Sequence, residues 1–288
     1  MIYLITVNYY STELIAKLLA SIQAQSSASY QFVIINNSPD DRLLQTLKED
    51  SILVLEAGDN LGFGGGCNLG LNWVYAQDKE AIAWLINPDA TFPEGALEQA
   101  INFCTLHPYL SIIGTIVEEP GGNIWFAGGE FNPENGRIIA ENSFSNSTDD
   151  YIETSWITGC SLLLNLKKFP SCPQFDPDFF LYYEDFDFCR RYAQQGHTVA
   201  VTNQIRVIHQ PSSITSRNPS LKFEHSTYSY LLALTKHTRR TVVLYRLGRI
   251  LFHALRASLV EPEKAIAIIK GVFSYVVRVR SLGKSTID

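Results

Sequence analysis

The chain has 288 residues, 46% of them hydrophobic and 18% charged, which excludes a disordered protein and suffices for one large domain or two small ones. Its net charge of −6 argues against a protein whose whole surface binds nucleic acid. The charge is uneven: residues 1–235 carry 12 Lys and Arg against 26 Asp and Glu, whereas residues 236–288 carry 11 against 3.

The five cysteines indicate a reducing compartment. Their number is odd, their spacing is irregular and no two form a CxxC pair, so neither a disulfide framework nor a zinc site is expected. The N-terminus lacks the basic flank and apolar run of a signal peptide, and no stretch approaches the roughly 20 apolar residues of a membrane span. We therefore expect a cytoplasmic protein.

The first 117 residues alternate between short apolar runs and amphipathic segments. Because such alternation is typical of a parallel sheet with helices on both faces, ligands are expected beyond the carboxyl ends of the strands. Polar clusters at 8–11, 36–41, 59–68 and 87–89 all follow predicted strands. The predicted strands are 2–7, 32–35, 52–55, 81–86 and 111–117, and the predicted helices are 13–24, 43–47, 67–76 and 93–103.

The rhythm changes after residue 117. Residues 118–155 are rich in Gly, Asn, Glu and Ser and predict a hairpin and a mobile loop. A strand over 156–166, a helix over 184–194, strands over 199–201 and 205–208 and a polar loop over 211–219 follow. From about residue 222 the pattern is helical to near residue 280, with a break at 261–262. The predicted domains are a catalytic domain over 1–221, with halves of 1–117 and 118–221, and a helical tail over 222–288.

A run of glycines follows the third predicted strand. Gly62 and Gly64 match the start of a dinucleotide-binding fingerprint, but Cys67 stands where the third glycine belongs, and that fingerprint normally follows the first strand. A nicotinamide site is therefore disfavoured. A bare backbone surface that borders a nucleotide or a sugar is favoured over a plain flexible loop.

Asn87-Pro88-Asp89 ends the fourth strand. A carboxylate at this place can hold a divalent cation against a diphosphate, because Mg²⁺ and Mn²⁺ prefer oxygen ligands. The same tripeptide also suits a plain turn. His209 ends a later strand before a polar loop, where it is either structural or a further metal ligand.

The segment 179–191 carries three acids directly after an aromatic run. Asp187 lies four residues before Arg191, so on a helix the two can form an ion pair. Glu184 and Asp185 lie at the predicted helix start, where the helix dipole favours acids. An acid beside aromatic walls can take a proton from a substrate hydroxyl, and we assign this role to Asp185.

Taken together, these motifs resemble the family 2 glycosyltransferases with a GT-A fold, most closely the rhamnosyltransferase-like branch. The resemblance covers about residues 1–215, with the motifs in the same order. It implies an α/β fold with a Rossmann-like, mostly parallel central sheet, helices on both faces and a C-terminal helical extension. The matching residues are Val7-Asn8-Tyr9, Asn36-Asn37-Ser38, Asn60, Gly62-Phe63-Gly64-Gly65-Gly66, Asn68, Gly70, Asn87-Pro88-Asp89, Gly159, Phe180, Tyr182, Glu184-Asp185, Asp187, Cys189-Arg190-Arg191 and His209.

The resemblance also implies the roles of individual residues. Asp89 would bind Mg²⁺ or Mn²⁺ at the second acidic position of the family's DxD motif, with Asn87 at the first, and His209 would complete the metal site. Asp185 would deprotonate the acceptor. The residues assigned to the nucleotide and donor sugar are Asn8, Tyr9, Asn36, Asn37, Gly62, Phe63, Gly64, Asn68 and Asn87, and those assigned to the acceptor side or a secondary role are Gly159, Tyr182 and Glu184.

The expected reaction is an inverting transfer of a sugar from a nucleoside diphosphate, with L-rhamnose from dTDP-rhamnose as the first choice. The acceptor would be a hydroxyl of a glycan or lipid-linked molecule in cell-surface polysaccharide synthesis. A UDP- or GDP-sugar donor is an alternative. A nucleotidyltransferase is disfavoured because residues 56–78 contain no Lys or Arg for a triphosphate. A non-catalytic nucleotide-sugar-binding module is a third class.

The basic C-terminal segment predicts amphipathic helices over 239–280. Arg239, Arg246, Arg249, His253 and Arg256 share one helix face. On another face lie Leu247, Leu251, Leu255 and Leu259. Such a helix either lies on an anionic membrane surface, which would make the protein peripheral on the inner face of the membrane, or packs on protein, including a second copy in a homodimer. Amphipathicity alone does not distinguish the two.

Overall fold

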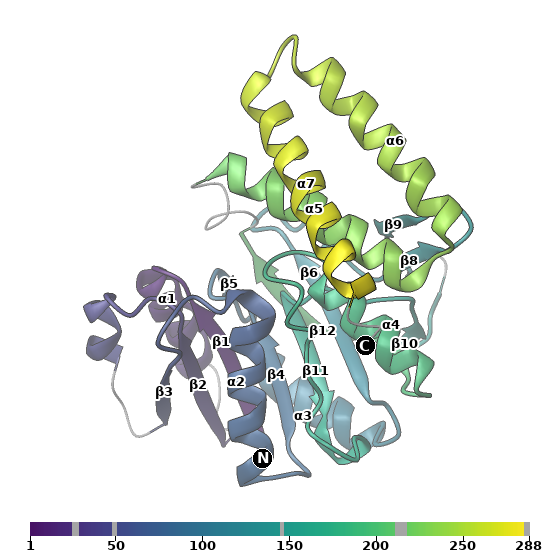
Figure 1. The fold of residues 1–288 in the computed structure, drawn as a ribbon. Coiled ribbons are helices and arrows are strands. Elements are labelled where there is room, and N and C mark those ends of the chain that lie inside the picture. Colours follow the sequence, from purple (N-terminus) through teal and green to yellow (C-terminus); the bar gives the residue numbers. More distant parts are fainter. Residues whose placement is uncertain (25–28, 48–50, 145–146, 211–217, 285–288) are drawn as a thin grey trace.

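The computed structural model describes residues 1–24, 29–47, 51–144, 147–210 and 218–284. In these residues a 10-stranded mixed sheet lies between helices, a small two-stranded sheet lies beside it, and three helices follow at the C-terminus (Figure 1). The polar loop expected over 211–219 falls mostly outside the described residues.

The N-terminal part of the sheet is parallel, as its alternating pattern predicts, in the order β3-β2-β1-β4. The helices α1 and α3 cover one face of the sheet and α2 the other. The elements of this part are β1 (Ile2–Asn8), α1 (Thr12–Gln23), β2 (Tyr30–Asn36), the 3₁₀ turn η1 (Arg42–Leu47), β3 (Ile52–Glu56), α2 (Gly62–Gln77), β4 (Ile82–Ile86), β5 (Ala90–Thr91), α3 (Ala96–Leu106) and β6 (Ile112–Glu118).

The rest of the sheet makes it mixed rather than mostly parallel. β11 lies antiparallel between β4 and β6, while β12 runs parallel to β6. Among the described residues, only strands and loops, and no helix, connect β6 to β11. Without a helical crossover to carry the chain back to the other end of the sheet, β11 runs antiparallel to β6. The elements of this part are β7 (Ile124–Phe126), β8 (Gly129–Asn132), β9 (Arg137–Ala140), β10 (Tyr151–Glu153), β11 (Ser161–Asn165), the 3₁₀ turn η2 (Leu166–Lys168), α4 (Glu184–Gln194) and β12 (Val199–His209).

Two local predictions need correction. The glycine run 62–66, expected as a loop, forms the first turns of α2. The strands expected at 199–201 and 205–208 are a single strand, β12, with an irregularity between Thr202 and Arg206. In both cases local polarity or glycine content favours a loop, and packing against the sheet overrides it.

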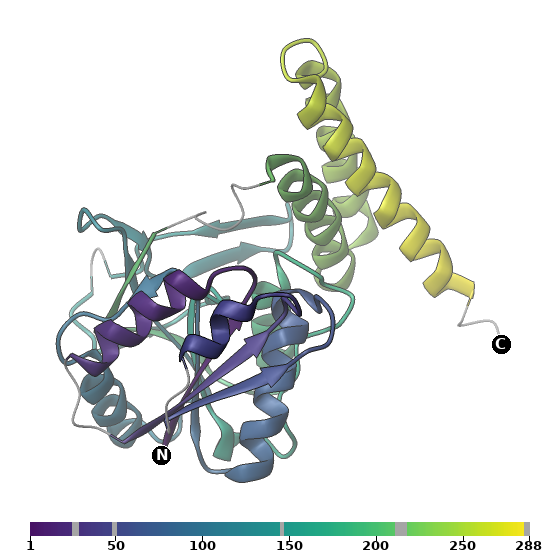
Figure 2. The same cartoon turned by 90° about the vertical axis from the view of Figure 1, so that its left-hand side faces the viewer.

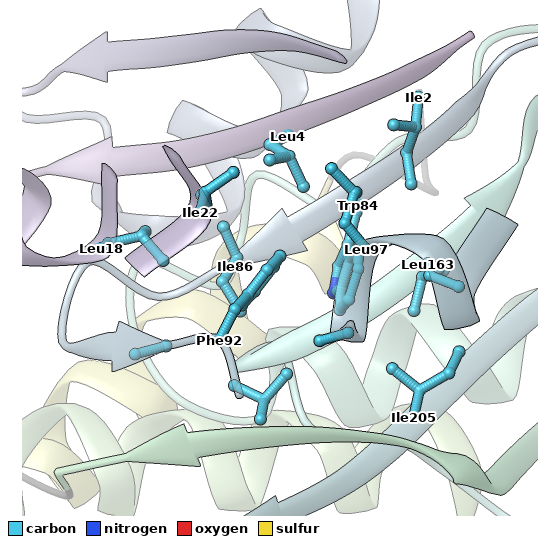
Figure 3. Close-up of a cluster of buried hydrophobic side chains, with 14 of the residues drawn as sticks. Ile2, Leu4, Leu18, Ile22, Trp84, Ile86, Phe92, Leu97, Leu163 and Ile205 are labelled. Carbon is cyan, nitrogen blue, oxygen red and sulfur yellow. The ribbon is translucent and has the colours of Figure 1, made fainter. Parts of the chain in front are cut away.

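The apolar core lies on both faces of the sheet, because every residue of β1 is buried and successive side chains point to opposite sides. Ile2 and Leu4 pack with Leu18 and Ile22 of α1 and with Trp84 of β4 (Figure 3). Trp84 stacks on Phe92 at 4.6 Å and donates a hydrogen bond to Ser161. This core fixes the strand ends that carry the polar clusters.

Glycines in α2 allow the helix to lie close to the sheet. A Cβ at Gly66 would come within 2.9 Å of Val7, and one at Gly70 within 2.6 Å of Ile5. Gly62 has a φ of +73°, and a Cβ there would collide with the carbonyl oxygen of Phe180 at 2.0 Å. The glycine run therefore serves helix packing, and it brings the N-terminus of α2 against the loop before α4.

Three helices follow the sheet: α5 (Pro219–His237), α6 (Arg240–Ala257) and α7 (Pro262–Lys284). They share a core of Leu231, Leu234, Val243 and Tyr275. Seen from the side, α6 and α7 stand away from the sheet (Figure 2). The predicted domain boundary after residue 221 falls inside α5, and a second break, at 238–239, separates α5 from α6. None of the helices in the described part of the chain is both long and apolar enough to cross a membrane.

Candidate active site

A cavity of about 1280 Å³ opens beside the carboxyl ends of β1 and β4. It brings together side chains from the sheet, from the loop before α4 and from α5. Eleven of the fifteen residues that the sequence assigns to the site line this cavity. They are Tyr9, Asn37, Gly62, Phe63, Asn87, Asp89, Gly159, Tyr182, Glu184, Asp185 and His209.

One wall of the cavity holds Asp89 and His209, which lie 120 positions apart in the sequence. Nε2 of His209 lies 3.1 Å from Oδ1 of Asp89, and both side chains are about 95% buried. The antiparallel pairing of β5 with β12 places His209 opposite Ala90, the residue after Asp89. The backbone N–H of Gln210 also donates to the Asp89 carbonyl. The pair is thus fixed by strand register rather than by loop conformation.

Trp125 borders the same wall and was not singled out from the sequence. Its ring lies 4.8 Å from the His209 ring in an edge-on arrangement, and its side chain remains partly exposed. It comes from β7, in the segment 118–155, for which the sequence predicted a hairpin without residue roles. The antiparallel pairing of β7 with β6 brings it to the cavity.

The other wall of the cavity carries two neighbouring acids, Glu184 and Asp185, at the start of α4. Tyr182 and Tyr183 both adopt left-handed backbone conformations, with φ of 68° and 62°. For non-glycine residues such conformations cost energy, and they occur preferentially at functional sites. Tyr183 is the N-cap of α4, so this turn aims Glu184 and Asp185 at the cavity.

Asp185 is oriented by the backbone. The N–H of Gly159 donates to its Oδ2 at 2.8 Å, and the N–H of Phe186 donates to its Oδ1 at 2.8 Å. Gly159 is required at this place, since a Cβ there would come within 2.7 Å of the Phe63 ring. The carboxylate is therefore held in one orientation while it still borders the cavity.

Burial changes the proton affinity of both acids. It raises the pKa of Asp185, whereas the amide hydrogen bonds from Gly159 and Phe186 act to lower it. Burial and the neighbouring charge of Asp185 raise the pKa of Glu184 well above its ordinary value. One oxygen of Glu184, Oε2, has no hydrogen-bond partner among the described residues.

Cys160 lies between the two walls, near both Asp89 and Asp185. Its buried thiol has a pKa raised well above the ordinary value, first by burial and then by the charges of Asp89 and Asp185. Both carboxylates therefore lie close enough to act on one side chain. The thiol is a free cysteine, as are the other four in the chain.

The predicted nucleoside residues divide into two layers. Tyr9 and Asn37 line the cavity, and Oδ1 of Asn37 has no hydrogen-bond partner in the described part of the chain. Asn8 and Asn36 lie behind them: the Asn8 amide donates to Oδ1 of Asn36, and the Asn36 amide donates to Oε2 of Glu56 at 2.8 Å. The structure thus uses Asn8 and Asn36 to connect the ends of β1, β2 and β3.

Gly64 and Asn68 also lie away from the cavity lining. The Asn68 side chain donates to the carbonyl of Phe175 and accepts from its N–H, at 2.9 and 2.7 Å. A Cβ at Gly64 would meet the Phe175 side chain at 3.0 Å. Both residues therefore connect α2 to the segment that leads into α4.

Asp187 forms the ion pair that its spacing predicts, and it has a second partner. Arg191 donates to its Oδ2 at 2.6 Å, and Nε2 of His237 in α5 lies 2.9 Å from its Oδ1. Asp187 is fully buried. The pairing with Arg191 is confirmed, and His237 ties α5 to the helix that carries Asp185.

The cavity also includes residues of α5 and its N-cap, which the sequence assigned to the second half of the catalytic domain, up to residue 221, or to the tail, without individual roles. His225 contacts the ring of Phe180 at 5.0 Å, and Ser229 donates to the carbonyl of Leu181 at 2.8 Å. No local signal identified these positions, since they lie in an ordinary amphipathic pattern. The cavity-lining residues from this region are Asn218, Leu221, Lys222, His225 and Ser226.

Comparison with known proteins identifies the class. The profile of the family described as glycosyl transferase family 2 matches residues 2–166, and the chain belongs to this family. The fold, a mixed GT-A-like sheet flanked by helices, agrees with that assignment. The protein is therefore a glycosyltransferase.

Individual proteins resemble this chain at low sequence identity. The low-salt glycan biosynthesis hexosyltransferase Agl10 of Haloferax volcanii is 25% identical over 239 residues, which cover 79% of this chain and 71% of the relative. Two solved structures share the fold at lower identity. The S. aureus TarS fragment 1–349 with UDP-GlcNAc has a TM-score of 0.59 at 14% identity, covering 96% of this chain and 80% of that fragment. The Pyrobaculum calidifontis mannosyltransferase PcManGT with GDP-Man and Mn²⁺ has a TM-score of 0.54 at 12% identity, covering 96% and 86%.

A third structure, GalNAc-T7 with UDP, GalNAc and Mn²⁺, has a TM-score of 0.61 at 12% identity. It covers 82% of this chain, but the chain spans only about half of that protein, 47% of its length. At such identities the likeness of these three structures concerns the fold alone.

Proposed function

We propose that this glycosyltransferase moves a sugar from a nucleoside diphosphate to an acceptor hydroxyl by a single inverting displacement. The observation that carries the proposal is one cavity lined by both an oriented carboxylate, Asp185, and an Asp89–His209 pair. In such a displacement the incoming hydroxyl loses a proton while the diphosphate leaves with negative charge. One base and one site for a cation meet both needs, and no protein nucleophile is required.

The Asp89–His209 pair fits a divalent cation. Oδ1 of Asp89 and Nε2 of His209 lie 3.1 Å apart at the cavity wall, and a carboxylate oxygen and an imidazole nitrogen side by side would hold such a cation. Among the described residues no third His, Cys, Asp or Glu joins them. A Mg²⁺ or Mn²⁺ held by this pair would stabilise the charge of the leaving diphosphate.

Asp185 serves as the base in this proposal. The N–H groups of Gly159 and Phe186 hold its carboxylate in place before the acceptor arrives, which reduces the entropy cost of a correctly aligned attack. Burial raises its pKa, so the carboxylate becomes a stronger proton acceptor than an exposed aspartate. Glu184, whose pKa is raised by burial and by the charge of Asp185, lines the same cavity, where its carboxyl group would contact a sugar hydroxyl.

The donor end of the cavity would be at Tyr9, Asn37 and the N-terminus of α2. The unpartnered Oδ1 of Asn37 would accept a hydrogen bond from the base or the ribose. Asn8 and Asn36 would support this surface from behind. The motif resemblance to the rhamnosyltransferase-like branch makes dTDP-rhamnose the first donor to test, with UDP- and GDP-sugars as the alternatives. The acceptor would be a glycan or lipid-linked hydroxyl in cell-surface polysaccharide synthesis.

The first experiment is the thermal stability of the full chain with dTDP, UDP or GDP, each with Mn²⁺, Mg²⁺ or EDTA. A ligand that binds only the folded state raises the melting temperature. We expect the largest shift with dTDP, and only when a divalent cation is present. A larger shift with UDP or GDP would change the donor, and equal shifts in EDTA would contradict the metal role of Asp89 and His209.

A further inference from the structure

The outer face of α6 exposes a stripe of large apolar side chains. Leu244, Phe252 and Leu255 of α6, and Leu259 just after its end, are between 62% and 87% exposed. The opposite face of the same helix packs into the C-terminal core through Val243, Leu247 and Ile250. The exposed stripe therefore is not needed to hold the three helices together.

Basic side chains border this stripe. A shallow groove of about 600 Å³ on α6 is lined by apolar, aromatic and basic residues. These are Leu244, Tyr245, Gly248, Arg249, Phe252, His253 and Arg256, here called the α6 surface. Arg249, His253 and Arg256 are spaced by four and three positions, so they form one row along the helix.

The cations of the α6 surface differ from their neighbours in lacking acidic partners. Arg278 pairs with Asp178, Lys264 pairs with Glu261, and Arg246 donates to the carbonyl of Asn135. In the described part of the chain, neither Arg249 nor Arg256 forms an ion pair, and Arg249 donates to the hydroxyl of Tyr245. Two arginines are thus available to an anionic partner directly beside exposed leucine and phenylalanine side chains.

We propose that the α6 surface binds the headgroup region of an anionic lipid bilayer. An apolar stripe bordered by arginines matches the boundary between acyl chains and negatively charged headgroups, and each basic residue near such a surface contributes about 1 kcal/mol. The acidic remainder of the chain, 12 Lys and Arg against 26 Asp and Glu in residues 1–235, is repelled by the same surface. The two charge distributions together orient the protein with α6 towards the lipid.

One helix, α5, joins the α6 surface to the cavity. α6 follows α5 directly, and α5 forms part of the cavity lining through Lys222, His225 and Ser226. Figures 1 and 2 both show α6 at the margin of the molecule rather than against the sheet. The proposal does not depend on the donor or on the catalytic residues, so its test does not use activity.

The experiment is co-sedimentation of the full chain with vesicles of phosphatidylcholine alone or with about one third phosphatidylglycerol. Binding is expected only to the anionic vesicles and should weaken as salt rises. The double variant Arg249→Gln/Arg256→Gln should bind about tenfold or more weakly, because two lipid-facing charges are lost. Phe252→Ser/Leu255→Ser should weaken binding without removing its salt dependence.

Matched controls come from the body of the protein. Lys17→Gln/Lys79→Gln removes two exposed charges, and Leu106→Ser removes an exposed leucine of α3; both should bind anionic vesicles as the unaltered chain does. An unchanged melting temperature would verify the fold of each α6 variant. Equal binding to neutral vesicles, or none to anionic ones, would overturn the proposal. So would a concentration-dependent dimer that the α6 variants abolish while the unaltered chain ignores vesicles, since the surface would then contact a second copy.

Discussion

The two functional walls of the cavity hold their acids in different ways. Asp89 is fixed by the β5–β12 strand pairing and faces an imidazole 3.1 Å away. Asp185 is held by hydrogen bonds from two backbone amides. It follows a turn in which two tyrosines adopt a left-handed backbone conformation. In the proposed function a cation completes the first wall, whereas the carboxylate of the second wall is already oriented by backbone amides. Substitutions should therefore affect donor binding at one wall and turnover at the other.

The largest expected effect is at Asp185. Asp185→Asn keeps the shape but removes the proton acceptor, so kcat should fall by about 10²–10⁴-fold, the usual contribution of a general base. The metal-dependent thermal shift with nucleotide should be retained. Initial rates and melting curves on the same preparation measure both. A variant that keeps its transfer activity would exclude Asp185 as the base.

The pH dependence of kcat/KM is a second test of Asp185 as the base. The ordinary pKa of an aspartate is about 3.9, and burial raises that of Asp185. The kcat/KM of the unaltered enzyme should therefore rise with pH, with a midpoint above this ordinary pKa. Below that midpoint the carboxyl is protonated and cannot accept the acceptor's proton. The step should be absent from the residual activity of Asp185→Asn. The same step in both proteins would assign it to another group.

At the opposite wall, Asp89→Asn and His209→Gln should reduce metal affinity by at least about 10 to 100-fold, since even indirect ligand support is worth that much. The cation concentration for half-maximal thermal stabilisation by nucleotide measures this effect. Excess Mn²⁺ should restore part of the activity of these variants but none of that of Asp185→Asn. Restoration of all three to the same degree would remove the distinction between the two walls.

A smaller effect is expected from Gly159→Ala. The added methyl group would collide with the Phe63 ring, at 2.7 Å, and displace the N–H that orients Asp185. Misplacement of a catalytic group by a fraction of an ångström lowers the rate, here by about tenfold. Gly121→Ala is the matched control, because its nearest neighbour would lie at 3.9 Å. Equal rates for both variants would show that the Gly159 amide is dispensable.

The smallest effect concerns stability. Burial raises the pKa of Glu184, so the unfolded chain releases this proton at a lower pH than the folded one, and stability falls as pH rises above about 4.3. Glu184→Gln should therefore melt a few degrees higher at pH 7, since about 1 kcal/mol corresponds to roughly 2–4 °C in large domains. The difference should vanish at about pH 3 and below, where both states are protonated. A lower melting temperature at pH 7 would contradict this account.

The sequence by itself determined the alternating elements of the N-terminal half, because buried strands and their terminal polar clusters are local patterns. Eleven of the fifteen assigned site residues line the cavity. Helix α4 begins and ends where its pattern predicted, and the Asp187–Arg191 pair follows from helical spacing alone. The motif resemblance identified Asp89, Asp185 and His209 as parts of one site. All three line the same cavity.

The tertiary structure decided which residues face the cavity and which distant segments meet there, and residue spacing does not determine either. Whether an asparagine at a strand end faces a ligand or a neighbouring strand depends on sheet order, which separates Asn37 from Asn8 and Asn36. The glycine run became a helix because close packing on β1 requires small residues. The roles of Trp125 and α5 arise from contacts between segments far apart in the chain. Local sequence encodes which face of an element is apolar, but the partner that covers that face is chosen only when the whole chain folds.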